Sequence, residues 1–236
     1  MRPASLARVR RVWREEIGAP AAFQDSGVTV FGHAPSDETA RVSLVRLGEA
    51  TAVVVPPALV DPLSEHIAQR PDGDLTDPST AVELVGPVAR FLGPAALAFA
   101  DDQCFRSRGS AATTTLPAGH DLIRELTAAC GPRDTQESAV AELPSPISVV
   151  ERDGTVVAAS GYEVWSAGVA HIGVLTHPRW RGRGLATAVA GAAVARALDA
   201  GLVAQWRART SLTASRRIAR SLGFIEVGQQ LSLWLA

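Results

Sequence analysis

Lysine is absent from this chain of 236 residues, because all 23 of its basic residues are arginine. Schiff-base catalysis needs a lysine amine, and a phosphate loop of the G-x-x-x-x-G-K-[ST] type needs a lysine side chain. Neither mechanism is therefore open to this protein. The formal net charge is only −1, so the chain as a whole gives no reason to expect a nucleic-acid or anionic-membrane partner.

Cysteine is scarce, and long apolar runs are missing. The two cysteines, Cys104 and Cys130, show no metal-ligand spacing, so we expect reduced, buried thiols and no metal site. No run of about 18 apolar residues could span a membrane. Residues 1–18 carry charges throughout, unlike a secretory signal. We therefore expect a soluble, cytoplasmic protein without a membrane partner.

The first part of the chain combines helices and strands. Apolar residues at helical spacing predict a helix over 5–17, and a proline-started helix is predicted over 56–69. A loop is expected over 71–80 because turn-forming residues are dense there. The predicted strands are 28–31, 40–47, 51–55 and 94–101. A polar, Gly/Ser-bearing stretch then predicts a domain boundary near residue 106, with a smaller N-terminal α/β domain (1–105) and a second domain (106–236).

The second part predicts an α/β sandwich with a mixed sheet. Asp153-Gly154 is a strong hairpin signal between two strands over 147–165. An apolar strand covers 169–176 and precedes an Ala-rich helix over 184–200. The other predicted helices are 118–130, 134–143 and 213–222, and the other predicted strands are 111–116, 202–208, 224–227 and 230–235.

The turn between strand 169–176 and helix 184–200 reads "HPRWRGRGLAT" and suits an anion. A helix that begins after a glycine turn presents unpaired N–H groups and the positive end of its dipole. Gly182 and Gly184 remove the Cβ atoms that would keep a phosphate from those amides. Arg179, Arg181 and Arg183 add positive charge, and Thr187 adds a hydroxyl. A diphosphate matches these donors better than a single carboxylate.

Other interpretations of this turn stay open on the residues alone. A dinucleotide fingerprint would need a third glycine where Thr187 stands. The next strand ends in Arg207 and Arg209 instead of an acid, so a dinucleotide site here would have to be of the NADP-binding type. The glycines could also serve only the packing of strand and helix, with the arginines as a solvated face. Nucleic-acid binding by the arginine-rich second half is disfavoured because aromatic residues are rarely interleaved with the arginines.

The segment "HPRWRGRGLATAV", preceded by an apolar strand, resembles the coenzyme A-binding signature of the GNAT N-acetyltransferase superfamily. The pattern Q/R-x-x-G-x-G/A is matched by Arg181, Gly184 and Ala186, and "WRARTSLTASRRIARSLGF" resembles the family's next strand, helix and "LGF" element. The resemblance covers slightly more than half of the chain. It implies a GNAT-type, mostly antiparallel mixed sheet flanked by helices. The N-terminal domain is then either a degenerate GNAT-like domain that forms one wall of the acceptor cleft or a domain that only supports the fold by burying apolar surface.

What the resemblance implies for the site is acetyl-CoA as co-substrate. The diphosphate would lie on the amides of Arg181 to Thr187, including Leu185, with Ser215 nearby. The pantetheine arm would pair with the backbone of Val174, Leu175 and Thr176, at an edge that opens because this strand splays from strand 202–208. An N–H near Val174 would polarise the thioester carbonyl. Acetyl transfer would go directly to an amine in a ternary complex.

The catalytic groups depart from the family pattern. Where many members have a tyrosine that protonates the departing thiolate, this chain has Ala219, and a frequent asparagine is replaced by Leu212. The acid is therefore unassigned. Candidates for the base are His171, Glu163, Tyr162 and Glu137, or a water molecule. Because Tyr162 and Glu163 are consecutive in a strand, at most one of them faces the cleft.

These features favour an N-acetyltransferase that acts on the primary amine of a small molecule. The alternative is an acyl-CoA-binding regulatory protein that has lost turnover, which Ala219 and the unassigned base suggest. No acidic tract points to recognition of basic peptide tails. A homodimer is a further expectation that the sequence itself does not specify.

Overall fold

The computed structural model describes residues 1–33, 40–69, 74–109 and 111–236. The described chain divides into two compact units, each made of separate stretches. Unit 1 consists of Met1–Ser5, Ala98–Arg207 and Ala214–Ile225, and unit 2 of Leu6–Leu97, Ala208–Thr213 and Glu226–Ala236. Each unit contains residues from before and from after residue 106. The division into domains 1–105 and 106–236 stays a prediction.

Unit 1 is built on a mixed, mostly antiparallel sheet, which confirms the predicted fold class. Its strands lie in the order β9-β8-β7-β6-β5. They are β5 (Thr114–Leu116), β6 (Ile147–Arg152), β7 (Thr155–Trp165), β8 (Val169–Thr176) and β9 (Val203–Arg209). All neighbours pair antiparallel except β8 and β9, which pair parallel. The hairpin at Asp153-Gly154 is confirmed, and both turn residues have positive φ.

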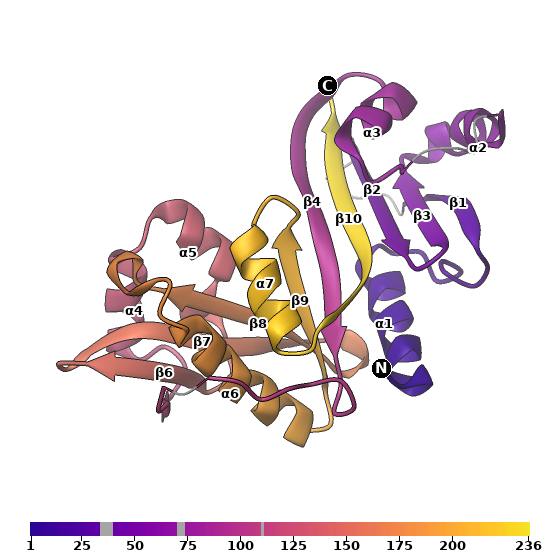
Figure 1. Cartoon of the computed structure of the whole chain (residues 1–236). Helices are drawn as coiled ribbons and strands as arrows, with labels where there is room; N and C mark the ends of the chain where they lie inside the picture. Colours follow the sequence, from indigo (N-terminus) through magenta and orange to yellow (C-terminus); the bar gives the residue numbers. More distant parts are fainter. Residues whose placement is uncertain (34–39, 70–73, 110) are drawn as a thin grey trace. The chain divides into compact units, whose positions relative to one another are not determined.

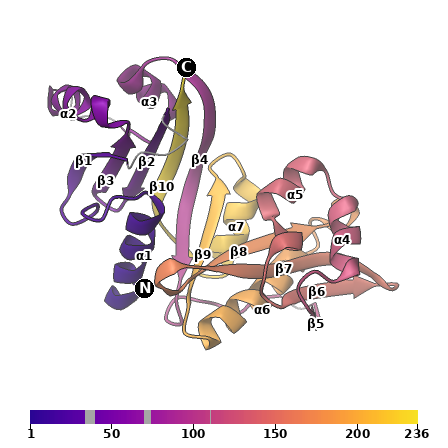
Figure 2. The ribbon, with the colours of Figure 1, turned by 180° about the vertical axis from the view of Figure 1, so that it is seen from behind.

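Helices cover both faces of the unit 1 sheet (Figures 1 and 2). On one face, Leu185 and Val189 of α6 (Leu185–Asp199) pack against Val150 and Ala158. The opposite face packs against α4 (Asp121–Ala128) and the turn η2 (Val140–Glu142), while α5 (Pro132–Ser138) lies between these two segments in the chain. The unit is completed by α7 (Thr213–Ser221), which begins one residue before the unit's last stretch. Burial of these apolar faces drives the assembly of the unit.

Unit 2 has its own sheet and core. Its strands lie in the order β1-β3-β2-β10-β4, with bounds β1 (Gly27–Gly32), β2 (Arg41–Leu47), β3 (Ala50–Val55), β4 (Val88–Ala100) and β10 (Ile225–Leu235). Its helices are α1 (Pro3–Glu16), whose first three residues belong to unit 1, α2 (Val60–Gln69) and α3 (Pro78–Val85), and the short turn η1 (Pro57–Leu59) precedes α2. Leu63 of α2 and Ala81 of α3 join the buried residues Leu44, Val53 and Leu231 in one core cluster.

Three local expectations were wrong. Of the loop expected over 71–80, residues 71–73 lie outside the described residues and 74–77 are a loop, whereas 78–80 begin α3, where the Asp77 side chain accepts hydrogen bonds from the N–H groups of Ser79 and Thr80. The two closing strands are one strand, β10, because Gly228 lets the backbone approach Arg46 of β2 too closely for any side chain. Cys104 is only partly buried, unlike Cys130.

Gly173 of β8 lies directly under the end of α5. A Cβ atom at this position would stand 2.3 Å from the backbone oxygen of Ser138 and 2.9 Å from Leu143 Cδ1. Because a backbone atom cannot swing away as a side chain can, the segment after α5 would have to shift. We expect Gly173→Ala to lower the free energy of unfolding by about 1–3 kcal/mol in urea titrations.

The matched control for this substitution is Gly131→Ala at the start of α5. Gly131 has a φ of −69°, and a Cβ atom there meets no atom within 4 Å. We expect its free energy of unfolding to change by no more than about 0.5 kcal/mol. An equal loss in both variants would show that the contact between Gly173 and Ser138 is not responsible.

Candidate functional site

The N-terminus of α6 is open to an anion. Gly182 and Gly184 both have a φ of +74°, a left-handed conformation that favours glycine, and a Cβ atom at either position would meet no atom within 4 Å. Gly184 is the N-cap of the helix, and no side chain caps it. Among the described residues, no side chain therefore caps the N–H groups of the first helical turn, from Leu185 to Thr187. A helix N-terminus with this geometry suits an anion such as a phosphate.

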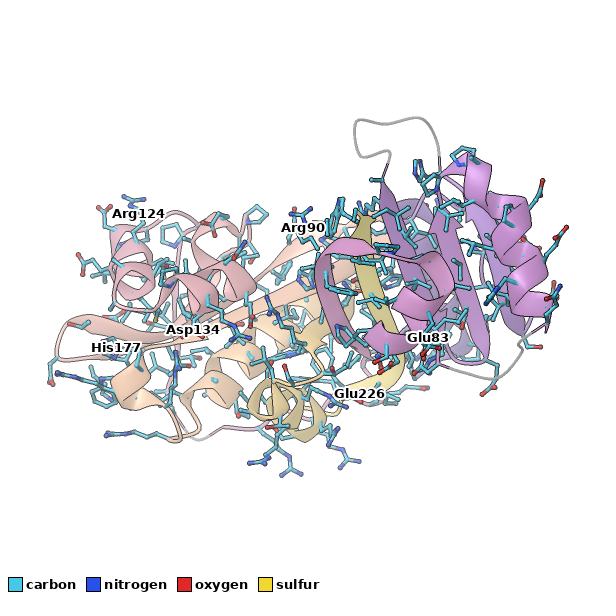
Figure 3. All side chains as sticks on the ribbon, turned by 90° about the horizontal axis from the view of Figure 1, so that it is seen from above. Glu83, Arg90, Arg124, Asp134, His177 and Glu226 are labelled. Atoms are coloured by element: carbon cyan, nitrogen blue, oxygen red, sulfur yellow. The ribbon has the colours of Figure 1, made fainter. Side chains whose placement is uncertain are left out.

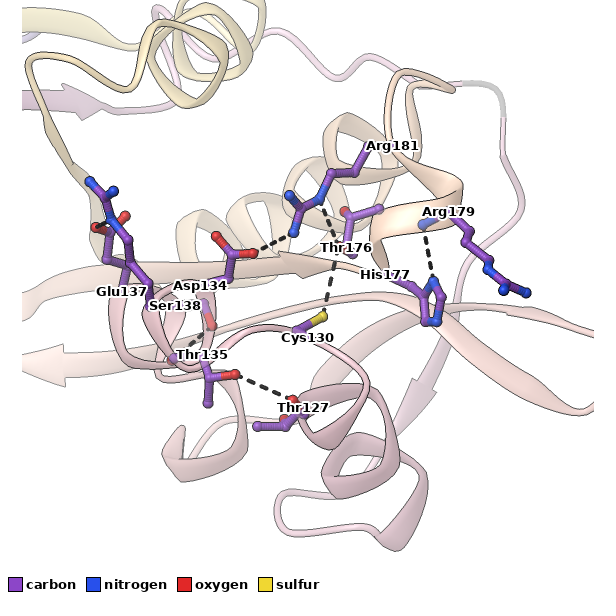
Figure 4. A network of polar contacts seen from close by, with 11 residues as sticks. Thr127, Cys130, Asp134, Thr135, Glu137, Ser138, Thr176, His177, Arg179 and Arg181 are labelled. Carbon is purple, nitrogen blue, oxygen red and sulfur yellow. Dashed lines mark hydrogen bonds and ion pairs between the residues drawn. The ribbon is translucent and has the colours of Figure 1, made fainter.

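Three arginines surround this turn, and one of them is anchored. Arg181 donates from Nε to the backbone oxygen of Thr176 (3.3 Å) and from Nη2 to Asp134 Oδ2 of α5 (2.6 Å), as Figure 4 shows. Figure 3 shows where Asp134 and His177 lie within the unit. Arg183 lies over the ring of Trp180 at 4.7 Å. The turn therefore combines fixed and exposed positive charge.

His177 and Arg179 shape the entry to the turn. The N–H of Arg179 donates to His177 Nδ1 over 3.2 Å, so the histidine side chain caps the short turn η4 (Pro178–Trp180) (Figure 4). In the described structure, the hydroxyl of Thr176 at the end of β8 is buried without a hydrogen-bond partner. A buried hydroxyl without a partner is costly, so a hydrogen bond from a bound ligand at this position would be stabilising.

Strand β8 has an open edge next to the α6 turn. It pairs with β7 along its whole length, from Val169 to Thr176, whereas its pairing with β9 covers only Val169 to His171. Both strands continue beyond this point, so they diverge from Ile172 onward in the described structure. The sequence predicted this divergence only through the family resemblance.

The hydrogen-bond direction identifies which amides face the open edge. The N–H of His177 donates to the backbone oxygen of Val157 on β7, so the odd-numbered residues of β8 direct their backbone groups toward β7. The backbone groups of Ile172, Val174 and Thr176 therefore point the other way, whereas those of Leu175 pair with β7. Val174 accordingly has a backbone N–H at the edge where an extended ligand could add as a strand.

Glu163, His171 and Gln205 lie side by side on one face of the sheet. Glu163 of β7 is the register partner of His171 of β8, and His171 is the register partner of Gln205 of β9. Directly paired residues project to the same face. Trp165 and Arg207, each two residues farther along β7 and β9, share this face as well. The result is a polar cluster that draws on three adjacent strands.

Short contacts connect the members of this cluster. The indole N–H of Trp165 donates to Glu163 Oε2 over 3.2 Å, and the rings of Trp165 and His171 are 4.8 Å apart. The Arg207 guanidinium lies 5.7 Å from the centre of the Trp165 ring. Burial, and secondarily the charge of Arg207, lower the pKa of His171 to about 3. His171 is therefore neutral at physiological pH.

The low pKa of His171 predicts acid sensitivity. In the unfolded chain its pKa is about 6.5, so below that pH the unfolded state binds a proton that the native state does not bind until about pH 3. The stability contribution is complete above pH 6.5 and is lost as the pH falls toward 3. Between pH 6.5 and 5 this amounts to about 2 kcal/mol.

Urea titrations of the wild type and of His171→Gln at pH 6.5 and pH 5 measure this contribution. The wild type should lose about 2 kcal/mol more free energy of unfolding over this interval than the variant. Equal losses would mean that His171 has the same proton affinity in both states.

The remaining candidates lie elsewhere in unit 1. Tyr162 is buried on the face opposite Glu163, which follows from strand alternation, and is thus not brought together with the polar cluster. Glu137 of α5 accepts a hydrogen bond from Arg133 Nε at 3.3 Å. The Ser215 hydroxyl on α7 accepts a hydrogen bond from Trp206 Nε1 at 3.0 Å.

Sequence reasoning missed the roles of Gln205, Arg207, Trp165 and Asp134 in these contacts. For Gln205 a signal existed, since it is the one polar residue in the apolar run "LVAQW". Within the described residues, no group of three or more His, Cys, Asp or Glu side chains could hold a metal ion. The described helices also include none that is long and apolar enough to cross a membrane.

Comparison with known proteins finds a similarity to one family in part of the chain. A family model described as GNAT acetyltransferase matches residues 148–230, from the start of β6 into β10. Known structures with a similar fold include a GNAT-family protein from Novosphingobium aromaticivorans, with a TM-score of 0.50 and 22% identity, over 64% of this chain and 70% of that chain. No curated protein sequence matches the chain significantly.

Two further structures show the same fold. An acetyltransferase from the GNAT family of Colwellia psychrerythraea has a TM-score of 0.50 and 14% identity, over 68% of this chain and 62% of that chain. A GCN5-related N-acetyltransferase from Kribbella flavida has a TM-score of 0.50 and 18% identity, over 66% and 63%. This chain thus spans less than two thirds of these last two relatives, and at such identities the likeness concerns the fold.

Proposed function

We propose that this protein transfers an acetyl group from acetyl-CoA directly to the primary amine of a small molecule, since residues 148–230 match a family model described as GNAT acetyltransferase. The observation that carries the proposal is the juxtaposition of two features in unit 1. The glycine-bounded N-terminus of α6, which no described side chain caps, follows after a short turn a strand whose edge opens at Ile172. A ligand with a diphosphate and an extended, amide-bearing arm fits both features at once.

The chain's residues have distinct roles in this proposal. The amides from Arg181 to Thr187 hold the diphosphate, and the guanidinium groups of Arg179 and Arg183 neutralise its charge. The open edge at Val174 pairs with the arm, and the Val174 N–H polarises the carbonyl of the thioester, which is the activated acyl group that the co-substrate supplies. Ser215 resembles a family position near the cofactor, and we assign to it a contact with the bound coenzyme A.

The attacking amine must lose a proton, and Glu163 is the group we assign to this step. Its side chain is exposed, and the Trp165 indole N–H orients its carboxylate. A carboxylate attracts an ammonium ion and can accept its proton, whereas His171, with a pKa of about 3, is too weak a base. The new C–N bond replaces the C–S bond, and the second proton that the nitrogen loses passes through water to the departing thiolate, because Ala219 offers no acid.

The second candidate function is an acyl-CoA-binding regulator without turnover. Ala219 favours it, because this buried residue stands where many family members have the tyrosine that protonates the thiolate. Both candidates should bind coenzyme A, and only the enzyme should release free thiol with an amine.

Thiol release from acetyl-CoA over a panel of small primary amines separates the two candidates. The enzyme should release thiol with at least one amine well above the background rate. Tight binding of coenzyme A in calorimetry, without release for any amine, would favour the regulator. No heat with either acetyl-CoA or coenzyme A would contradict both.

A further inference from the structure

Gln205 is a polar side chain inside the sheet of unit 1. It lies on β9 between Ala204 and Trp206 and is fully buried. Its amide nitrogen Nε2 lies 3.4 Å from Nδ1 of His171, its register partner on β8. Because a buried amide must have hydrogen-bond partners, this contact constrains both side chains.

The chemistry of the two groups fixes the direction of the hydrogen bond. An amide nitrogen can only donate, so Nδ1 of His171 must accept. A neutral imidazole carries its proton on the other nitrogen, which is Nε2. The Trp165 ring, 4.8 Å from the imidazole, limits the rotation of the ring on its other side.

We propose that Gln205 is a positioning residue that holds His171 as its Nε2–H tautomer, so that His171 is a hydrogen-bond donor and not a proton acceptor. The inference rests on the proposed function and adds to it. Of the register partners Glu163, His171 and Gln205, only Glu163 is then left to accept the proton of the amine. A neutral imidazole N–H is a known electrophilic group in catalysis, where it donates a hydrogen bond to a substrate oxygen. The tautomer itself is defined whether or not the protein transfers acetyl groups.

Long-range 1H–15N correlation spectra of the wild-type protein at pH 7 read the tautomer directly. His171→Asn identifies the signals of His171 among those of the five histidines. We expect a pyrrole-type signal for Nε2 and a pyridine-type signal for Nδ1. The reverse pattern in the wild type would overturn the proposal.

Gln205→Glu tests the role of Gln205, because a carboxylate only accepts hydrogen bonds and so favours a proton on Nδ1. We expect the two signals of His171 to exchange type in this variant, and kcat to fall about tenfold with an unchanged KM for acetyl-CoA. An unchanged tautomer in Gln205→Glu would overturn the positioning role.

A second variant covers the case in which a buried glutamate prevents folding. Gln205→Met keeps a similar volume without a donor, and we expect His171 to populate both tautomers in it. A pure Nε2–H tautomer in this variant would also overturn the role of Gln205. If coenzyme A binding fails while the tautomer is as expected, the proposed function is wrong and the inference stands.

Discussion

Gly184→Glu is expected to weaken coenzyme A binding at least about 100-fold. The substitution puts a side chain at a φ of +74°, which costs about 1–2 kcal/mol, and puts a negative charge at the helix N-terminus that would face the diphosphate. A turn that relaxes to relieve this strain must be restored on binding, and with the repulsion between the carboxylate and the diphosphate this costs about 3 kcal/mol, where each 1.4 kcal/mol corresponds to a factor of ten in affinity. Isothermal titration calorimetry with coenzyme A measures the loss.

The same helix provides a matched control at its other end. Gly201 follows α6, also has a φ of +74°, and a Cβ atom there meets no atom within 4 Å. Gly201→Glu therefore introduces the same charge and the same backbone strain away from the N-terminal turn. We expect it to bind coenzyme A like the wild type. Equal losses in both variants would mean that the amides at the start of α6 do not hold the diphosphate.

The elements that form this turn could be predicted from sequence because their signals are local. The apolar run 169–176 matches β8 at both ends, and the helix expected over 184–200 differs from α6 by one residue at each end. The glycines of the turn, Gly182 and Gly184, show positive φ, as expected of residues that expose backbone amides. Periodicity and turn chemistry suffice wherever neighbours in sequence decide the structure.

The polar cluster could not be predicted in the same way, because its contacts depend on register between strands far apart in the sequence. His171 and Gln205 meet only because β8 and β9 pair over three positions before they diverge. The low pKa of His171 follows from burial that the sequence around it does not reveal. The position of β10 in unit 2 is likewise a long-range result, since its register partner is β2 near the other end of the chain.

Glu163→Gln is expected to lower kcat about 100-fold with an amine that the wild type acetylates. Glutamine keeps the size of the side chain, and its amide oxygen can still accept the hydrogen bond from the Trp165 indole. It cannot take a proton from the attacking ammonium, and loss of a general base typically costs a factor of 10²–10⁴. Steady-state thiol release at saturating acetyl-CoA measures kcat, while calorimetry should find coenzyme A affinity unchanged.

Glu151→Gln is the control for removing a carboxylate from the same sheet. Glu151 of β6 is exposed and accepts a hydrogen bond from the Thr114 hydroxyl (3.3 Å), and it pairs with Val156, seven positions before Glu163 on β7. We expect this variant to retain wild-type kcat. If Glu163→Gln also retains it while Glu137→Gln loses activity, the base lies on α5 and our assignment to β7 is wrong. Activity in all three variants would instead favour deprotonation by water, because no side-chain carboxylate among them would then limit the rate.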